Sequence, residues 1–345
     1  MPSPSVPGSS ASPQAVGDTA PWSWQPPQAS LAVWPVSVLA LKGADTLRFL
    51  HGQSSQAIAL AQPGQVLATC CISPTARMQA LAEVLVDTNG AWLVISAGDG
   101  AAVRAALDRV LFPADAVSLA ELRPGLFCEA IPADRSQPVA AAPPLAWRPL
   151  ATGSGFWVGS HLLLLDTLQP PTDSRDLEPA AQTLLQRPRL SAAEQEHWRL
   201  QQGRPAWPDE VNDGTNPFEL GLAARVSLNK GCYVGQETLA KLATYDGVKQ
   251  QLRRWSVPGA VGPKPGASLS WAGERAGTVT SALALPDGNG WIGLALVRRQ
   301  ALAAPVLLTT GADEGAEPLA LQLSLPEAFV APPVGAGGAA STTQR

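Results

Sequence analysis

The most constraining feature of the chain is a stretch of eight residues, 230–237, which reads KGCYVGQE. A cation, a thiol, a phenol, an amide and a carboxylate meet there on a backbone with two glycines: Lys230, Gly231, Cys232, Tyr233, Val234, Gly235, Gln236 and Glu237. Glycine adopts backbone angles that other residues avoid, so the pair predicts a sharp turn. Polar groups on such a turn are typical of a functional site. The other interpretation is a solvated turn before a helix, with Cys232 as a small buried apolar residue.

Neighbouring segments extend this pattern, because residues 216–222 read NPFELGL, residues 226–229 read VSLN and residues 244–249 read TYDGVK. Together they resemble the signature of the YgfZ family, the folate-binding relatives of the glycine-cleavage T-protein, GcvT. That family carries the motif K-G-C-Y-x-G-Q-E, and residues 230–237 match all of its fixed positions. The resemblance implies a GcvT-like α+β fold, in which antiparallel sheets covered by helices surround a central cavity. It also implies a small antiparallel β-barrel at the C-terminal end.

A second segment, residues 41–53, supports the same resemblance, and we call it the opening box. It reads LKGADTLRFLHGQ, which is similar to the family pattern L-x-G-x-D-A-x-x-F-L-x-G-Q. Many relatives continue with T-N-D, whereas this chain continues with SSQ and lacks the Asp. Residues 73–78 read SPTARM and resemble a family turn S-P-x-G-R-x, with Ala76 in place of the Gly. Arg77 then either faces the ligand cavity or lies at the surface where a strand begins.

A third similarity lies in a helix expected over residues 190–203, which Gly203 ends. Family members end this helix with R-x-E-x-G-x-P, and the Glu of T-proteins binds the pterin ring. Gln201 stands at that position here. An amide can still donate to and accept from a pterin edge, but it cannot act as a base. Trp198 would form an aromatic wall of the site or pack on a helix face.

The pattern of apolar residues predicts the rest of the architecture. Strands are expected over residues 36–41, 65–72, 77–86 and 91–96, with a hairpin turn at residues 88–90. Helices are expected after Asp45, as an N-cap, and over residues 100–111, which gives an α+β layer. Short strands at regular spacing after residue 251 predict the barrel.

We therefore expect disordered tails over residues 1–30 and 333–345, a folate-binding region over residues 31–250 and a barrel over residues 251–332. The folate-binding region would contain two α+β units. One spans residues 31–118 together with 206–250, and the other spans residues 119–205.

Composition narrows the function classes. The chain has 345 residues, 46% hydrophobic and 15% charged, which indicates a globular protein. A net charge of -4 gives no general attraction to nucleic acid or to an anionic membrane. The four cysteines, Cys70, Cys71, Cys128 and Cys232, form no C-x-x-C pair. They therefore predict no metal site held by this chain alone, no disulfide framework and a cytoplasmic location. No apolar run approaches a membrane span, and the N-terminus lacks a secretory signal.

The family resemblance implies that the chain binds tetrahydrofolate and assists iron–sulfur cluster assembly or repair, with tRNA-modifying cluster enzymes among its clients. Candidate ligand residues are Arg77, Trp198, Gln201 and Lys230, and Cys232 would be the functional thiol. Lys230 could also stabilise the thiolate that each of its possible roles requires. The expected partners are folate and iron–sulfur enzymes or assembly proteins, and the chain is expected to be a monomer.

Two other functions remain open from the sequence. One is a folate-dependent aminomethyltransferase like the T-protein, and the other is a binding module without cysteine chemistry. A cysteine hydrolase would need His51, His161 or His197 beside Cys232. The absence of Walker A and dinucleotide-binding patterns gives no support for nucleotide binding.

Overall fold

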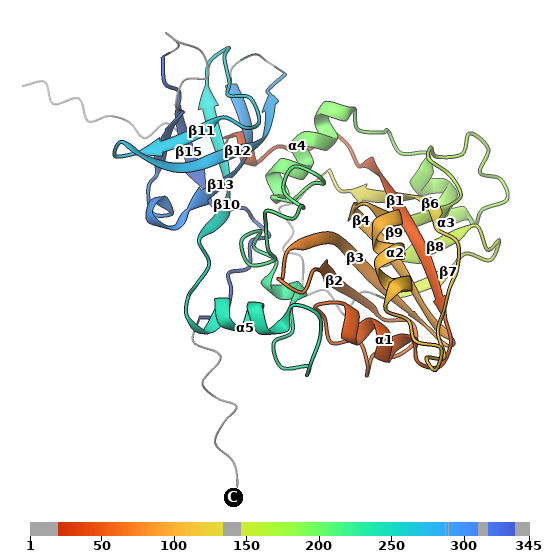
Figure 1. The fold of residues 1–345 in the computed structure, drawn as a ribbon. Coiled ribbons are helices and arrows are strands. Elements are labelled where there is room, and N and C mark those ends of the chain that lie inside the picture. Colours follow the sequence, from red (N-terminus) through yellow and green to blue (C-terminus); the bar gives the residue numbers. More distant parts are fainter. Residues whose placement is uncertain (1–19, 134–145, 287, 289, 310–316, 335–345) are drawn as a thin grey trace, which may run out of the picture.

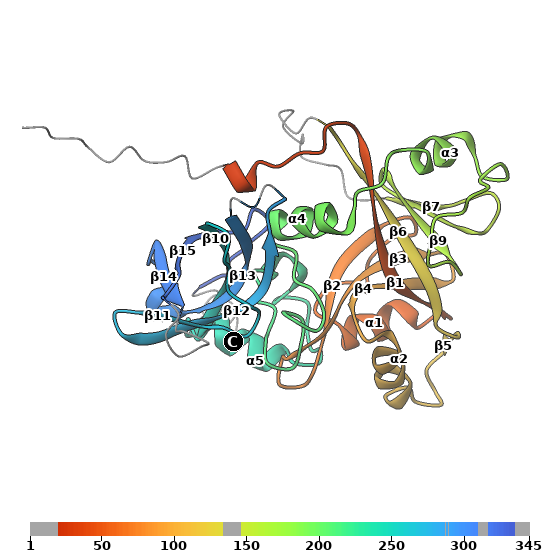
Figure 2. The same ribbon diagram turned by 90° about the horizontal axis from the view of Figure 1, so that it is seen from above.

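A computed structural model describes residues 20–133, 146–286, 288, 290–309 and 317–334 (Figure 1). In this range an α+β body joins a closed β-barrel, as expected from the sequence. Figures 1 and 2 both show helix α4 between the large sheet and the barrel. None of the helices in the described range is long and apolar enough to cross a membrane.

The body is built on one antiparallel nine-stranded sheet in the order β2-β3-β4-β1-β6-β9-β8-β7, with β5 paired to β1. Its strands are β1 (Ser30–Lys42), β2 (Val66–Ile72), β3 (Met78–Asp87), β4 (Gly90–Gly98), β5 (Ser118–Leu119), β6 (Arg123–Ile131), β7 (Trp147–Pro149), β8 (Gly155–Val158) and β9 (His161–Leu165). Strands from both sides of residue 119 pair directly in this sheet. The division into two units at that residue stays a prediction.

The expected hairpin between β3 and β4 is confirmed, and Gly90 makes it possible. Gly90 has φ of +138°, and a Cβ atom there would lie 2.1 Å from the carbonyl oxygen of Leu41. Only glycine fits both the backbone angle and this close approach. The hairpin therefore fixes the register between β4 and β1, in which Lys42 faces Gly90.

Helices α1 (Thr46–Gln53) and α2 (Gly100–Arg109) lie along the same side of the sheet (Figure 2). They bury their apolar faces with Leu39 and Leu41 of β1. Asp99 caps α2 by accepting hydrogen bonds from the backbone N–H groups of Ala101 and Ala102. Asp45 occupies the expected N-cap position of α1, but its carboxylate makes no cap hydrogen bond and instead binds Ala116 N and Arg48.

Three further helices and three short 3-10 helices complete the helices of the described part of the chain. They are α3 (Pro179–Leu185), α4 (Ala192–Gln202) and α5 (Gln236–Thr244), with short 3-10 helices η1 (Ala20–Trp22), η2 (Ala223–Arg225) and η3 (Arg299–Ala301). Ser191 and Glu194 form a capping box at the start of α4. Gly203 ends α4 in the left-handed conformation with φ of +69°, as the sequence predicted.

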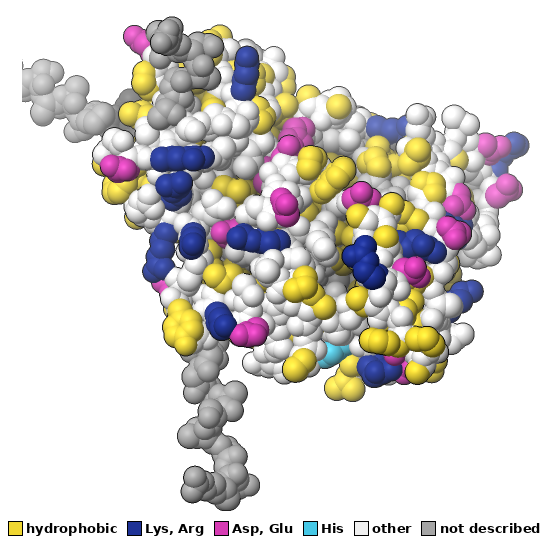
Figure 3. Space-filling view, in the orientation of Figure 1, with side chains coloured by type: hydrophobic (Ala, Val, Ile, Leu, Met, Phe, Trp, Pro, Cys, Tyr) yellow, Lys and Arg dark blue, Asp and Glu magenta, His cyan; other side chains and the backbone are white. Residues whose placement is uncertain are grey.

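The barrel closes in the order β10-β13-β12-β11-β14-β15. Its strands are β10 (Gln250–Pro258), β11 (Ser268–Trp271), β12 (Glu274–Ala284), β13 (Gly290–Arg298), β14 (Val306–Thr309) and β15 (Ala320–Ser324). Trp255 is fully buried in its core and donates a hydrogen bond from Nε1 to the Leu294 carbonyl at 2.9 Å. On the face in Figure 3, Lys and Arg side chains gather over the barrel side, whereas acidic and basic groups are mixed over the sheet side.

The N-terminal tail was expected to extend to residue 30, and this is wrong for the described residues 20–30. Trp24 stacks on His197 of α4 with ring centroids 5.2 Å apart, and the guanidinium of Arg254 lies 4.6 Å from the Trp22 ring. His197 Nε2 donates to the carbonyl of Pro21 at 2.8 Å. The segment 20–24 therefore packs across α4 to the barrel. The predictions for residues 1–19 and 335–345 lie outside the described residues.

Candidate functional site

Residues 230–237, which we call the Cys loop, form the expected glycine-hinged turn before α5. Gly231 has φ of +90° and Gly235 has φ of +79°. A Cβ atom at Gly235 would lie 2.7 Å from the Ser73 carbonyl oxygen, so the loop rests directly on the turn at residues 73–77. Cys232 is exposed, which rules out its interpretation as a buried apolar residue. The loop therefore presents a thiol to solvent.

Lys230 anchors this loop to the end of α1. Its ammonium donates to the backbone carbonyls of His51, Ser54 and Gln56, the last two at 2.6 and 2.8 Å. These carbonyls belong to or follow the last turn of α1, where the helix lacks internal partners for them. The ammonium also lies 4.3 Å from the centre of the Tyr233 ring.

The charge state of Lys230 is set by two opposing effects. Burial lowers the pKa of the Lys230 ammonium to about 7, whereas the three carbonyl oxygens and the ring face favour its charged form. All three N–H donors are occupied by these carbonyls. In this conformation Lys230 therefore anchors the loop and has no donor left for a ligand.

His51 joins the opening box to the Cys loop from the other side. Its Nδ1 accepts from the backbone N–H groups of Ile58 and Ala59, both at 3.1 Å. The proton must then lie on Nε2, which donates to the Lys230 carbonyl at 2.7 Å. Val234 N also donates to the Gly52 carbonyl at 3.0 Å. The structure thus brings the two motifs together, but His51 has no free nitrogen to act as a base for Cys232.

The remaining histidines have other partners. His161 Nδ1 accepts from Ala130 N at 3.1 Å, and His197 binds the segment 20–24. Desolvation lowers the pKa of both side chains. Neither contact involves the Cys loop, so the structure gives no support to a Cys–His catalytic pair.

The other polar residues of the Cys loop point in different directions. Glu237 is exposed and pairs with Lys241 at 2.7 Å on the surface of α5. Gln236 begins α5 and is half-buried. Tyr233 is only 8% exposed, and its phenol oxygen has no hydrogen-bond partner within the described part of the chain. Burial raises the pKa of Tyr233 to about 12.

A pocket of about 370 Å³, which we call the α2 pocket, shares an apolar cluster with the Cys loop. It is lined by Met78, Gln79, Asp99, Ala102, Val103, Trp207, Val211, Asn212 and Asp213. Tyr233 packs in the same apolar cluster as Met78 and Val211 of the pocket wall. Arg77 lies at the rim, because its Nη1 donates to the Gly214 carbonyl at 3.2 Å, next to Asp213.

The groups that a ligand could meet in the α2 pocket are an aromatic face, an amide and a carboxylate. Trp207 is 51% exposed although it is a large aromatic residue. The side chains of Gln79 and Asp213 have no hydrogen-bond partner among the described residues, whereas Asn212 binds the Pro208 and Asp209 carbonyls. Sequence reasoning missed these residues. The only available signal was a polar, tryptophan-containing loop directly after the helix that resembles the family pattern.

Trp198 and Gln201, which the sequence placed at the ligand, do not line this pocket. Trp198 is 5% exposed and donates from Nε1 to Glu129 at 3.2 Å. Gln201 is fully buried, and its Nε2 donates to the Trp24 carbonyl at 3.2 Å. Its Oε1 has no partner in the described residues. Arg77 is likewise absent from the pocket lining, but it lies next to Met78 in the chain and binds the carbonyl of Gly214, the neighbour of Asp213, whereas Trp198 and Gln201 lie beneath the N-terminal segment.

The chain is similar in sequence to several known proteins. No family model matches the chain. It is 27% identical over 293 residues to a putative chloroplastic transferase of Arabidopsis thaliana, covering 80% of this chain and 66% of the relative. It is 42% identical over 72 residues to the tRNA-modifying protein YgfZ of Yersinia pestis, covering 19% and 22%. An aminomethyltransferase of Halothermothrix orenii is 28% identical over 100 residues, covering 29% and 28%.

A solved structure decides the fold. The glycine cleavage system aminomethyltransferase T from Bartonella henselae matches with a TM-score of 0.68 over 89% of this chain and 88% of that one, at 18% identity. The chain is thus similar in sequence to YgfZ over part of its length and has the fold of a GcvT-type aminomethyltransferase. The predicted GcvT-like α+β fold with a C-terminal barrel is thereby confirmed. The matches span between 22% and 66% of the curated relatives' own lengths. The activity of the chain is therefore stated below as a proposal.

The cysteines of this chain fall into two classes. Cys70, Cys71 and Cys128 are buried, and burial raises their pKa values to about 11, 12 and 12. Cys232 alone among the four is exposed. Within the described ranges, no three His, Cys, Asp or Glu side chains are grouped to hold a metal ion.

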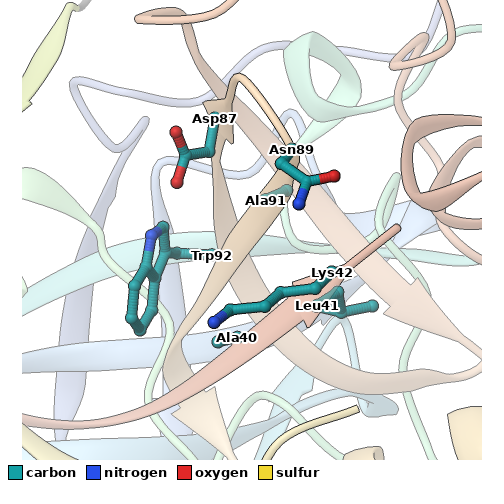
Figure 4. A pocket seen from close by; sticks show the side chains of 7 residues that line it. All are labelled: Ala40, Leu41, Lys42, Asp87, Asn89, Ala91 and Trp92. Atoms are coloured by element: carbon teal, nitrogen blue, oxygen red, sulfur yellow. The ribbon is translucent and has the colours of Figure 1, made fainter. Parts of the chain in front are cut away.

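A second pocket, of about 230 Å³, lies at the hairpin end of the sheet and shares no lining residue with the α2 pocket. Figure 4 shows Lys42 from β1, Asp87 from β3 and Trp92 from β4 around it, with Asn89 from the hairpin turn. None of the candidate residues from the sequence lines it.

Proposed function

We propose that this chain binds tetrahydrofolate and acts as an accessory protein in the assembly or repair of iron–sulfur clusters of other enzymes, tRNA-modifying enzymes among them. One observation carries the proposal: the residue after the exposed Cys232, Tyr233, packs in one cluster with Met78 and Val211 of the α2 pocket wall. The loop that presents the thiol and the wall of a ligand-sized pocket therefore belong to one apolar cluster. The relative named tRNA-modifying protein YgfZ supports the same direction.

The residues of the α2 pocket fit a pterin. A pterin needs an aromatic or apolar slot for its ring and polar groups for its hydrogen-bonding edge. The Trp207 face can stack on the ring, while the Asp213 carboxylate accepts from its N–H groups and the Gln79 amide donates to its oxygen. Arg77 at the rim can pair with the glutamate tail. Lys230, Trp198 and Gln201 then support the surrounding structure rather than the ligand.

Cys232 would work as a presented thiol rather than as a hydrolytic nucleophile. It is exposed, and His51 beside the loop has both ring nitrogens occupied. A single cysteine cannot hold a cluster, but it can supply one ligand to a cluster shared with a client protein. It can also form a mixed disulfide with a client thiol. Both roles require a protein partner that reaches the Cys loop.

The alternative is a folate-dependent aminomethyltransferase. The fold of the Bartonella henselae enzyme and the plant relative named a putative transferase favour it. In that case Asp99 and Asp213 of the α2 pocket are the carboxylates available for proton transfer. This function needs the pocket but not the Cys232 thiol. We further propose that the chain is a cytoplasmic monomer whose macromolecular partners are proteins rather than nucleic acids.

The experiment that tests the proposal is complementation of a strain that lacks its own YgfZ-type protein, with tetrahydrofolate calorimetry on the same variants. We expect Cys232→Ala to abolish complementation and to change the tetrahydrofolate Kd by less than about twofold, because the thiol lies outside the pocket lining. Glu237→Gln, an exposed change in the same loop, is the matched control and should complement fully. Full complementation by Cys232→Ala would refute the thiol role. One-carbon transfer to tetrahydrofolate by both proteins would establish the transferase instead.

A further inference from the structure

Residues 204–214, which we call the pocket loop, supply much of the α2 pocket. They contribute Trp207, Val211, Asn212 and Asp213 to its lining. All of these residues are described, and none belongs to a regular helix or strand. A loop without regular backbone pairing needs side-chain contacts to hold a half-exposed tryptophan in one place.

Glu210 provides the central contact of this loop. It is fully buried, and its Oε2 accepts from Ala206 N at 2.8 Å and from Arg199 Nη1 at 3.4 Å. Its Oε1 accepts from the Ser281 hydroxyl at 2.6 Å. The Thr215 hydroxyl donates to the Glu210 carbonyl at 2.7 Å, which ties the end of the loop to the same residue. A buried carboxylate is tolerated only with such partners, so its position is strongly specified.

Arg199 completes the arrangement from α4. Its Nη1 donates to the carbonyl of Arg204, where the loop begins, at 2.7 Å. Its Nη2 donates to the Ser281 hydroxyl at 2.8 Å, and that hydroxyl in turn donates to Glu210. Ser281 lies on β12 of the barrel and is 4% exposed. One hydroxyl of the barrel thus bonds to both charged groups that hold the pocket loop.

We propose that Arg199, Glu210 and Ser281 form a positioning network that sets Trp207 and Asp213 at the α2 pocket, so that the barrel controls ligand affinity from outside the pocket. None of the three residues lines the pocket. Their influence must therefore pass through the pocket loop. Buried ion pairs are weak contributors to stability compared with apolar packing, and in this protein the network contributes the position of the loop. This inference rests on the proposed function for the identity of the ligand only.

The test uses Ser281→Ala in the full chain, with tetrahydrofolate as the probe. The substitution leaves Glu210 Oε1 and one Arg199 N–H without their buried partner. We expect the Kd for tetrahydrofolate to rise about tenfold, as for loss of one hydrogen bond to a charged group. Thr280→Val is the matched control, because the neighbouring Thr280 hydroxyl is buried without a partner in the described structure. Its Kd should stay within about twofold of wild type.

A second readout needs no ligand. Acrylamide quenching of each protein is compared with that of its Trp207→Phe counterpart, and the difference isolates Trp207. We expect Ser281→Ala to change the quenching of Trp207, and Thr280→Val to leave it as in wild type. Ser281→Thr keeps the hydroxyl and should restore both readouts, which a purely structural role of the site would not require.

The outcomes separate the two proposals. If Ser281→Ala lowers the Tm but leaves the Kd and the quenching of Trp207 unchanged, the positioning role is overturned. If the wild-type chain does not bind tetrahydrofolate, the proposed function fails, and the quenching experiment alone decides the positioning role. If Ser281→Ala does not fold, Glu210→Gln replaces it, because Gln keeps the volume and an acceptor but removes the charge that pairs with Arg199. Unchanged quenching in Glu210→Gln would then refute the network.

Discussion

The sequence predicted that the Cys loop and helix α4 both contribute to one ligand site. The structure exposes the thiol of the Cys loop but buries the predicted ligand residues of α4. The Cys loop is anchored at its base and exposed at its thiol, since Lys230 is held by three carbonyls while Cys232 faces solvent. On α4, Trp198 and Gln201 are buried beneath the segment 20–24 and Glu129. A matching motif thus identifies a position in the fold, whereas the contacts around it decide whether the side chain can meet a ligand.

The largest effect should come from removing the anchor of the Cys loop. Lys230→Met keeps the stem but leaves the carbonyls of His51, Ser54 and Gln56 without their donor. We expect the free energy of unfolding to fall by about 2–4 kcal/mol, measured by urea denaturation. Lys241→Met is the control, because that exposed lysine pairs with Glu237 at the surface and its loss should leave the free energy of unfolding nearly unchanged.

A smaller Lys230 effect, equal to that of Lys241, would mean that the carbonyls find water instead. The anchored character of the Cys loop would then disappear, and Lys230 would be available to a ligand after all. Tetrahydrofolate titration of Lys230→Met distinguishes the two cases, because an anchor affects stability first and a ligand residue affects the Kd first.

The two glycines of the Cys loop give the next largest effect. Gly235→Ala places a Cβ atom 2.7 Å from the Ser73 carbonyl oxygen at φ of +79°, whereas Gly231→Ala at φ of +90° meets no atom within 4 Å. We expect about 2–3 kcal/mol of destabilisation for Gly235→Ala and about 1 kcal/mol for Gly231→Ala, since only the first adds a collision to the backbone strain. Thermal unfolding of both variants measures the difference, and equal effects would show that the loop does not rest on residues 73–77.

The sequence predicted those parts of the fold in which local pattern and tertiary structure agree. The hairpin at Gly90, the end of α4 at Gly203 and the barrel strands all follow from turn residues and alternating apolar residues. Local pattern failed where a distant segment supplies the partner. Residues 20–30 read as a tail from their Pro/Ser content, because nothing near them in sequence reveals that Trp24 stacks on His197. The role of Lys230 was hidden for the same reason, since its acceptors lie in the opening box.

The smallest effect on stability should come from removing the Trp24 side chain, which packs on α4. Trp24→Ala keeps the backbone carbonyl that accepts from Gln201 but removes the ring that stacks on His197. We expect a loss of about 1–2 kcal/mol in the free energy of unfolding, from one partly buried aromatic contact. Trp271→Ala on the barrel is the control, because Trp271 is already 44% exposed and makes no ring contact among the described residues.

The pH dependence of the free energy of unfolding reports on how well the segment 20–24 shields His197 from water. Burial lowers the pKa of His197, so the unfolded chain binds its proton more readily, and stability declines as the pH falls below the ordinary value of about 6.5. Removing Trp24 admits water to the ring, and the pKa of His197 should therefore rise towards that value. Proton NMR can follow this, because the chain has only three histidines and His51 and His161 lie elsewhere. An unchanged His197 titration in Trp24→Ala would mean that residues other than Trp24 keep water away from the His197 ring. The buried state of Gln201 would then be a property of α4 rather than of the N-terminal segment that crosses it.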